Sequence, residues 1–367
     1  METRAWRHFD VVMILATVAL CIYGVAMIYS ATLGTEGGSG LDSRVVRQVL
    51  YVVVGLLLLV AVATTDYQVL SSVATAAYVS CAALLLVVLV VGRLTHGSRR
   101  WIPLGFIDLQ PSELAKLALA IMLAKFLAEN QDGIRNLRVV AQSAGLALVP
   151  AALTFAQPDL GTGLVFVVIW LGTILVAGLR WLHAALLALL TAAAAPLAWL
   201  TMPQYMRDRV YVFIDPYQKP LDEGYNVIQA LISVGSGGLT GRGFTSGTQS
   251  QLHFLRVQYA DFIFSVLAEE LGFVGALALL VLLGVLLLRG LRAATISRDA
   301  FGRLLCVGIV SGLAFQTFVN VGMNAGLLPV TGVPLPLISY GGSSALSVLV
   351  GIGILESVAM RHRRFEF

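Results

Sequence analysis

Residues 11–28 read VVMILATVALCIYGVAMI and contain no charged side chain. An apolar run of this length can cross a hydrocarbon core of about 30 Å as an α-helix. Inside lipid the backbone must satisfy its own hydrogen bonds, so a continuous run of this kind is helical. The basic start of the chain resembles a signal sequence, but the run is too long and lacks a clear cleavage site. These features predict an uncleaved first span.

Similar apolar runs recur along all 367 residues, of which 58% are hydrophobic and only 12% charged. A soluble chain carries about 25% charged residues, so this protein has too few charged side chains to form a water-exposed surface. The runs do not alternate with period two, which argues against a β-barrel. The chain is predicted to be a single all-α polytopic membrane domain over residues 1–367. About ten transmembrane helices are expected, at residues 9–30, 46–64, 68–92, 111–128, 137–155, 161–179, 182–202, 262–288, 303–325 and 337–360.

The placement of arginines predicts the orientation of these spans. With the N-terminus inside, the inward segments hold about twelve arginines and the short outward loops about five, as the positive-inside rule requires. Both termini are therefore expected in the cytoplasm. Residues 203–261 then form a large extracytoplasmic loop between spans seven and eight, and a loop of this length is usually functional. Within it, residues 225–234 have the pattern of an amphipathic interfacial helix, and residues 235–247 are rich in glycine.

Composition and spacing argue against several classes of function. The net charge of +4 is scattered and gives no basic stripe for nucleic acid. The glycine-rich stretch matches neither the P-loop nor the dinucleotide-binding pattern. The five histidines lack the spacing of metal ligands. The three cysteines all fall within predicted spans, so no disulfide framework is expected.

Asp261 immediately precedes the apolar run that starts at Phe262, and two roles are open for it. As a helix N-cap, it would accept hydrogen bonds from the first N–H groups of the helix. As a partly desolvated carboxylate above a bundle cavity, it would be suited to act as a general base. Ser265 and Glu269 follow at i+4 and i+8, so all three are expected on one helical face, with Glu269 inside the membrane.

Other polar side chains stand at the outward ends of predicted spans. Glu113 and Lys116 are spaced for an intrahelical ion pair, which is either structural or part of a charged cavity wall. Asp159 is placed to cap the sixth span. Arg99 and Arg100 lie in an outer loop, where they could bind a phosphate or meet lipid headgroups.

Residues 326–344 read GLLPVTGVPLPLISYGGSS, with three prolines and several glycines among apolar residues. This composition does not form a regular helix, because proline removes a hydrogen-bond donor and clashes with the preceding turn. Irregular backbone at membrane depth is tolerated only where it is buried in protein or lines a cavity. Ser339, within this run, is therefore a candidate cavity residue.

Four motifs together resemble those of the SEDS family of shape, elongation, division and sporulation proteins. They are QPSE at 110–113, QPDLG at 157–161, DFIF at 261–264 with Glu269-Glu270, and PLPLISYGGS at 334–343. Several long motifs in the same order, over nearly the whole chain, are not expected by chance. Two further segments, GVPLP at 332–336 and GTQSQL at 247–252, have the form found in the elongation member of the family.

This resemblance implies a peptidoglycan glycosyltransferase of the bacterial inner membrane that polymerises lipid II during cell elongation and cell-shape maintenance. It also implies a partner, a class B penicillin-binding protein that cross-links the strands. The family's essential aspartate falls on Asp261, and its conserved Glu and Lys fall on Glu113 and Lys116. The chain departs from the family just before the aspartate. Where many relatives have Pro-Glu-Arg/Ala-His-Thr, residues 256–260 read RVQYA, without a second acid or a histidine.

The implied reaction joins the GlcNAc 4-hydroxyl of one lipid-linked disaccharide to the MurNAc anomeric carbon of another, and undecaprenyl pyrophosphate leaves. Asp261 is the expected general base. The leaving group needs arginines or a divalent cation, Mg²⁺ or Mn²⁺. The candidate arginines, chosen by location, are Arg99, Arg207, Arg209 and Arg242. The remaining candidates for substrate binding or the cavity are Glu113, Lys116, Asp159, Glu269 and Ser339.

Two other functions are compatible with the same residues. A lipid II flippase or transporter also uses intramembrane charges and broken helices, although here the polar residues cluster outward and no repeated halves are evident. A scaffold that only positions the penicillin-binding protein would keep its function without Asp261 and Glu113. Whether the purified protein alone turns lipid II into polymer separates the three hypotheses.

Overall fold

The protein is a bundle of long helices. The computed structural model describes residues 8–33, 43–91, 93–95, 98–103, 108–218, 223–252, 254–255 and 258–361. Within these residues nine helices are long and apolar enough to cross a membrane, which confirms an α-helical multi-pass membrane protein. They are α2 (Val11–Thr32), α3 (Ser43–Thr64), α4 (Gln68–Val91), α6 (Leu137–Ala156), α7 (Leu160–Ala177), α8 (Trp181–Thr201), α12 (Ile263–Ile296), α13 (Ala300–Asn324) and α14 (Gly342–Met360).

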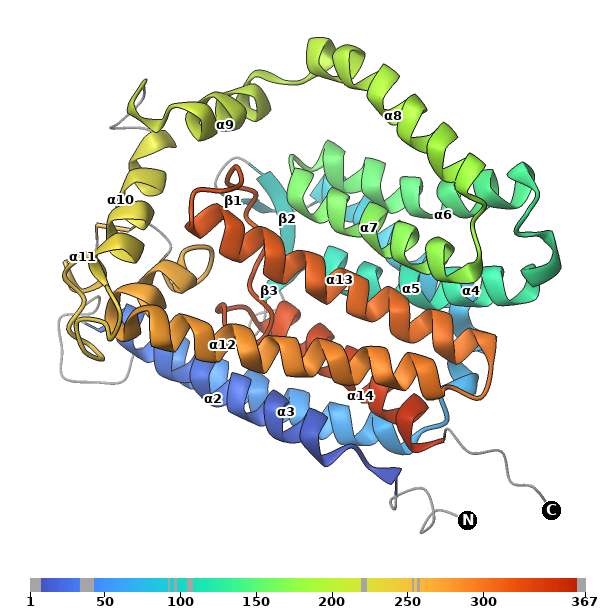
Figure 1. The fold of residues 1–367 in the computed structure, drawn as a ribbon, viewed down its shortest axis with the longest axis horizontal. Coiled ribbons are helices and arrows are strands. Elements are labelled where there is room, and N and C mark those ends of the chain that lie inside the picture. Colours follow the sequence, from blue (N-terminus) through green and yellow to red (C-terminus); the bar gives the residue numbers. More distant parts are fainter. Residues whose placement is uncertain are drawn as a thin grey trace.

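A further helix, α5 (Pro111–Glu129), occupies the predicted fourth span and has a similar length. It differs from the nine in having more than two charged side chains within any 18 residues, from Glu113, Lys116, Lys125 and Glu129. Pro111 stands at its first turn, where a missing N–H is tolerated. The helix packs against α4, α7 and α13 (Figure 1), and its buried charges, Glu113 and Lys116, lie within the bundle.

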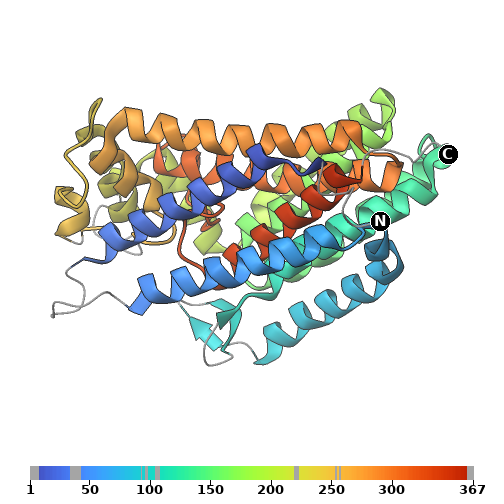
Figure 2. The same cartoon turned by 90° about the horizontal axis from the view of Figure 1, so that it is seen from below.

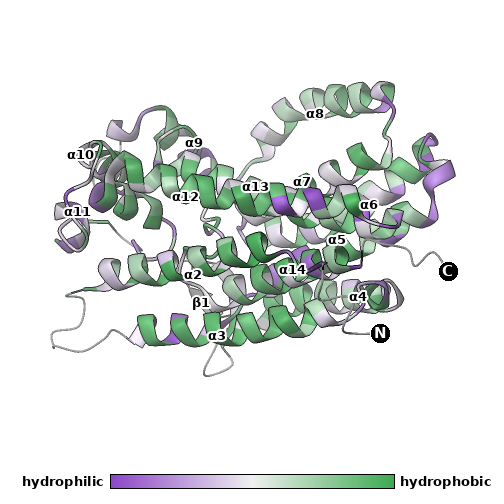
Figure 3. Ribbon diagram, turned by 60° about the horizontal axis from the view of Figure 1, so that its bottom comes forward, coloured by the Kyte–Doolittle hydropathy of each residue, from purple (hydrophilic) through white to green (hydrophobic). Residues whose placement is uncertain are grey.

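The helices run roughly along the horizontal axis of Figure 1, so the connections gather at two ends. The start of α2 and the end of α14 lie at one end, and α10 (Glu223–Ser236) and α11 (Thr248–Gln251) lie at the other. Figure 2 shows α2 and α3 running beside α12 and α14. The helices are hydrophobic along much of their length, and many hydrophilic residues gather at the two ends (Figure 3). Such a distribution suits a lipid environment.

The end that carries α10 and α11 also holds most of the irregular structure. Residues 203–261 contain α9 (Gln204–Ile214), the 3₁₀ turn η3 (Pro216–Gln218), α10 and α11, so the predicted amphipathic helix is confirmed as α10. Between α4 and α5 lies a small antiparallel sheet that the sequence did not predict, made of β1 (Arg93–Thr95), β2 (Ser98–Pro103) and β3 (Asp108–Leu109). A 3₁₀ turn, η2 (Gln131–Gly133), follows α5. α8 stands apart from the bundle (Figure 1), and none of its side chains that the structure describes is buried.

α12 is broken near its start, at Gly272, where φ is 66° and ψ is −164°. A break in a helix leaves backbone N–H and C=O groups without hydrogen-bond partners. Residues 237–243 of the glycine-rich stretch provide partners for these groups. A Cβ at Gly241 would lie 2.1 Å from the carbonyl oxygen of Glu270, so this close approach requires glycine. Four backbone N–H···O bonds of 2.9–3.1 Å join the segments, from Arg242 to Glu269, Gly243 to Glu270, Phe273 to Gly238 and Val274 to Leu239.

Two predicted span boundaries differ clearly from the structure. α12 continues to Ile296 rather than ending at 288. α14 begins at Gly342 rather than at 337, because the proline-containing run remains non-helical up to that point. Leu337 in this run has a φ of 63°, which does not belong to a right-handed helix. The irregular backbone predicted for residues 326–344 is thus confirmed over residues 326–341.

Candidate functional site

Asp261 lies in the turn just before α12, with a partly exposed side chain. The helix α12 begins at Ile263, and its N-cap is Phe262. Asp261 lies one residue before the N-cap, so its interpretation as the N-cap is wrong. The backbone carbonyl of Asp261 instead accepts hydrogen bonds from the side-chain amides of Asn320 (3.2 Å) and Asn324 (3.0 Å). These two bonds fix the backbone of Asp261 against α13.

The same two asparagines connect the Asp261 turn to its neighbours. Asn320 also donates to the carbonyl of Val333 (2.8 Å), and Asn324 accepts from the hydroxyl of Ser265 (2.7 Å). The proline-containing run is thereby held close to the aspartate, since a Cβ at Gly332 would lie 3.8 Å from Asp261 Oδ2.

Sequence reasoning missed both asparagines. They follow Gln316 at intervals of four residues, so the three amides share one face of α13. Polar side chains at this spacing within an apolar span are the signal that could have found them. These three amides form a stripe that runs from the Asp261 turn into the bundle.

Ser339 supports the Asp261 turn from the other side. Its hydroxyl donates to the carbonyl of Ala260 (2.7 Å) and accepts from the N–H of Leu335 (2.9 Å). The N–H of Tyr340 donates to the carbonyl of Tyr259 (2.9 Å). Ser339 is buried, and its contacts are with backbone groups that shape the turn.

Asp159 has two partners at the start of α7. Its carboxylate accepts from the N–H of Thr162 (3.2 Å), which confirms the predicted cap. It also lies 3.6 Å from a guanidinium nitrogen of Arg100, which in turn donates to the carbonyl of Gln157 (3.2 Å). The backbone of Arg99 is in β2, but its side chain lies outside the described part of the structure.

Arg209, on α9, is within electrostatic reach of two carboxylates, those of Asp159 and Asp261. Its guanidinium is directed at the proline-containing run, with the carbonyls of Val330 (3.3 Å) and Thr331 (3.5 Å) as acceptors. Burial lowers the pKa of Arg209 from its ordinary value, and the nearby charge of Arg100 lowers it further. Asp159 and Asp261 act in the opposite direction on this pKa. A half-buried cation therefore stands within the electrostatic reach of Asp261.

The other two arginines chosen by location have different surroundings. Arg207 donates to the carbonyl of Leu200 (2.7 Å), near the end of α8. Arg242 is exposed and donates to the hydroxyl of Thr248 (3.1 Å), which itself donates to Glu269. Among the candidate arginines with described side chains, Arg209 is the one that the recorded interactions connect with Asp261.

Glu269 is fully buried away from this cluster. It accepts hydrogen bonds from the N–H groups of Gln249 (2.8 Å) and Ser250 (3.2 Å) and from the hydroxyl of Thr248 (3.1 Å). These residues form the start of α11. The prediction that Asp261 and Glu269 share one helical face is wrong, because Asp261 precedes the helix.

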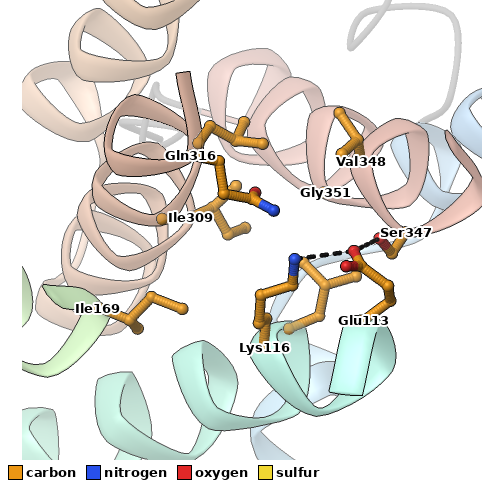
Figure 4. A pocket seen from close by; sticks show the side chains of 11 residues that line it. Glu113, Lys116, Ile169, Ile309, Gln316, Ser347, Val348 and Gly351 are labelled. Carbon is orange, nitrogen blue, oxygen red and sulfur yellow. Dashed lines mark hydrogen bonds and ion pairs between the residues drawn. The ribbon is translucent and has the colours of Figure 1, made fainter. Parts of the chain in front are cut away.

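Glu113 and Lys116 form the predicted ion pair, at 2.8 Å, inside the bundle. The hydroxyl of Ser347 donates to the same oxygen of Glu113 (3.1 Å), while Glu113 Oε1 is buried without a hydrogen-bond partner among the described residues. Figure 4 shows the pair at a small cavity between α5, α7, α13 and α14, with Gln316 on the facing side. Its volume of about 30 Å³ accommodates water but not a sugar.

Known proteins share both the sequence and the fold. Residues 11–364 match the family model of the cell cycle proteins FtsW, RodA and SpoVE. The chain is 40% identical to the peptidoglycan glycosyltransferase MrdB of Escherichia coli K12, over 96% of this chain and 93% of MrdB. RodA of Thermus thermophilus has a similar structure, with a TM-score of 0.72 and 32% identity over 97% of this chain and 98% of RodA.

A second solved structure is more similar in fold, with a TM-score of 0.82 and 34% identity over 96% of this chain and 97% of that one. It concerns the structural coordination of polymerization and crosslinking by a peptidoglycan synthase complex. Together with the family match, these similarities confirm the resemblance to the SEDS proteins. The chain therefore belongs to the FtsW, RodA and SpoVE family of cell cycle proteins.

Proposed function

We propose that this protein is a peptidoglycan glycosyltransferase that polymerises lipid II at the outer face of the bacterial cytoplasmic membrane, for cell elongation and cell-shape maintenance. The relatives named above support this activity. The observation that carries it is the partly exposed carboxylate of Asp261 within electrostatic reach of the half-buried cation Arg209. A general base and a ligand for a leaving pyrophosphate are thus provided in one place.

The topology that we propose has ten spans, with α5 as the fourth, and both termini in the cytoplasm. The start of α2 and the end of α14 lie at the same end of the bundle, as an even number of crossings requires. The Asp261 turn then faces outward, together with α9, α10 and α11. The polar ends of the substrates would reach it there while their lipid tails stay in the membrane.

In the proposed reaction Asp261 accepts the proton of the GlcNAc 4-hydroxyl as that oxygen attacks the MurNAc anomeric carbon. The new C–O bond forms while the bond from this carbon to the pyrophosphate oxygen breaks. The negative charge of the departing undecaprenyl pyrophosphate develops beside Arg209 and Arg100, which stabilise it. Asp159 keeps Arg100 in place through their contact of 3.6 Å.

Glu113 and Lys116 support the site from below in this proposal. Their cavity is too small for a sugar, and both side chains are buried. The stripe of Gln316, Asn320 and Asn324 leads from this cavity to the backbone of Asp261. We therefore assign the ion pair to the shape of the bundle beneath the aspartate, not to contact with the substrate.

A divalent cation and a partner enzyme complete the proposal. No group of three or more His, Cys, Asp and Glu side chains in the described residues could hold a metal ion. Mg²⁺ or Mn²⁺ would therefore be held chiefly by pyrophosphate oxygens, with few protein ligands. A class B penicillin-binding protein is the proposed partner, in line with the synthase complex that the fold resembles.

The decisive experiment is polymerisation of lipid II by the purified full-length protein carrying Asp261→Asn. Losing a general base lowers the rate by about 10²–10⁴-fold. The melting temperature should change little, because the substitution keeps the size of the side chain and the backbone carbonyl still accepts from Asn320 and Asn324. A strand-forming rate equal to that of the wild type would remove Asp261 from the mechanism.

Asp215→Asn is the matched control, because Asp215 lies in the same outward segment and accepts a hydrogen bond from the N–H of Tyr217 (3.1 Å). It should polymerise lipid II like the wild type. Movement of lipid II across vesicles without any polymer would favour a flippase. An inactive wild-type protein that still binds its partner would favour a scaffold.

A further inference from the structure

A second cavity, of about 290 Å³, lies at the end of the molecule opposite to Asp261, where α2 begins and α12 ends. It has no role in the proposed reaction, which takes place at the other end. The residues that line it are His8, Phe9, Asp10, Arg289, Arg292, Ile296 and Ala359. Basic and apolar side chains are thus combined where helices leave the membrane.

One of the two arginines is already neutralised. Arg289 contacts Asp10 through two nitrogens, with Nη2–Oδ2 at 2.5 Å and Nε–Oδ2 at 2.7 Å. Asp10 also caps α2 by accepting from the N–H of Met13 (3.1 Å). Glu356, fully buried behind Asp10, accepts its N–H (2.7 Å) and does not line the cavity. Arg289 is therefore held rigidly at the cavity wall.

The second arginine is different. Arg292 follows Arg289 by three residues and lies on the same face of α12. It is exposed and forms no ion pair with any residue that the structure describes. The cavity wall thus presents one unbalanced cation, which favours an anionic ligand.

The surface around the cavity is apolar. Val11 and Leu15 on α2 are 57% and 63% exposed, and Leu288 and Leu291 on α12 are 66% and 43% exposed. α2 and α12 run side by side (Figure 2), so a ligand in the cavity would continue onto hydrocarbon-facing helices. A free anion makes no use of such a surface, whereas a phospholipid uses both parts.

We propose that this cavity binds the phosphate of an anionic membrane phospholipid, in the leaflet next to the start of α2. Arg292 and Arg289 contact the phosphate oxygens, and the acyl chains lie along α2 and α12. This lipid is distinct from the substrate, because it occupies the opposite leaflet. Its binding does not depend on the proposed catalytic activity.

The test uses native mass spectrometry of the full-length protein released from membranes that contain phosphatidylglycerol and phosphatidylcholine in equal amounts. The wild type should retain phosphatidylglycerol in preference. Arg292→Gln should weaken this retention about fivefold, which corresponds to about 1 kcal/mol for one cation near the surface. Because Arg292 is exposed, this variant should fold like the wild type.

Arg303→Gln is the matched control, since Arg303 is an exposed arginine near the start of α13, at the same end but outside the cavity. It should retain phosphatidylglycerol like the wild type. An equal loss in both variants, or equal retention of the two lipids by the wild type, would overturn the proposal. Displacement of the bound lipid by millimolar inorganic phosphate would also overturn it, because the cavity would then be a site for a free anion.

Discussion

Two acidic regions lie at the start of α12, and they use their carboxylates differently. Asp261 is partly exposed in a turn, and its surroundings include the cation Arg209. Glu269 and Glu270 are fully buried two turns further on, and no salt bridge to either is found in the described part of the chain. Glu270 accepts instead from the hydroxyl of Ser30 (2.6 Å), among other neutral donors.

The difference lies in the donors around each carboxylate. A buried carboxylate surrounded by hydroxyl and backbone N–H donors is already satisfied, and it holds those donors in place. A carboxylate in an open turn next to a cation can still accept a proton from a substrate. The donors around a carboxylate therefore distinguish a structural role from a reactive one. Its depth in the membrane and its position on a helix do not.

After the loss of Asp261 itself, the largest effect should come from removing the cation beside it. Arg209→Ala should lower the rate of lipid II polymerisation by about 10²–10³-fold, because the charge that develops on the pyrophosphate loses a preorganised donor. Arg242→Ala is the control, since Arg242 is an exposed arginine beside the other acidic region. Steady-state assays that give both variants the same rate would show that the two regions do not differ as proposed.

The next effect concerns stability. Glu270→Ala leaves the hydroxyl of Ser30 and the N–H of Thr245 without this acceptor. The hydroxyl of Ser250 loses one of its two acceptors and keeps the carbonyl of Gly247. We expect the free energy of unfolding to fall by about 2–3 kcal/mol, seen as a lower melting temperature in detergent. Polymerisation per folded molecule should persist.

Glu129→Ala is the control for this prediction, because Glu129 is an exposed glutamate at the end of α5. Its melting temperature should match that of the wild type. If Glu270→Ala melts normally but makes no polymer, the buried pair takes part in the reaction after all.

Much of the fold follows from the sequence because lipid imposes simple requirements. Apolar length predicts the spans, and proline predicts the irregular run that contains Gly332 and Leu337. The break at Gly272 was not predicted, because a glycine inside an apolar run does not by itself end a helix. What permits the break is the glycine-rich segment 237–243, which supplies hydrogen bonds from about 30 residues earlier in the chain.

The site was predicted in part. The Glu113–Lys116 ion pair was predicted and is confirmed, whereas the catalytic role of Asp261 stays a prediction. Arg99 was the candidate named from the sequence, and the structure shows Arg100 beside Asp159. Adjacent residues of a strand point to opposite faces, so the partner of an arginine there depends on how the strand is oriented, which the sequence does not show. The helix α12 starts at Ile263, one residue later than predicted. This difference also depends on a tertiary contact, the hydrogen bond from Asn320 on α13 to the carbonyl of Asp261.

A smaller effect should follow from loosening the Asp261 turn. Asn324→Leu removes one of two amides that bind the Asp261 carbonyl. We expect kcat to fall about tenfold, a loss of about 1.4 kcal/mol, while KM for lipid II stays constant, because positioning affects the reacting geometry. Thr317→Val is the control on α13, since Thr317 bonds only to its own helix at Leu313. Equal kcat values in the two variants would remove Asn324 from the support of Asp261.

Glu113 combines features of both acidic regions, because it is buried like Glu270 and has a cation nearby like Asp261. Ser347→Ala removes its hydroxyl donor and leaves Lys116 in place. If the pair is structural, stability should fall by only about 1 kcal/mol and polymerisation should continue at nearly the wild-type rate. A normally melting Ser347→Ala protein without activity would instead mean that the protonation or orientation of Glu113 controls the reaction. The surrounding donors would then no longer separate structural from reactive carboxylates in this bundle.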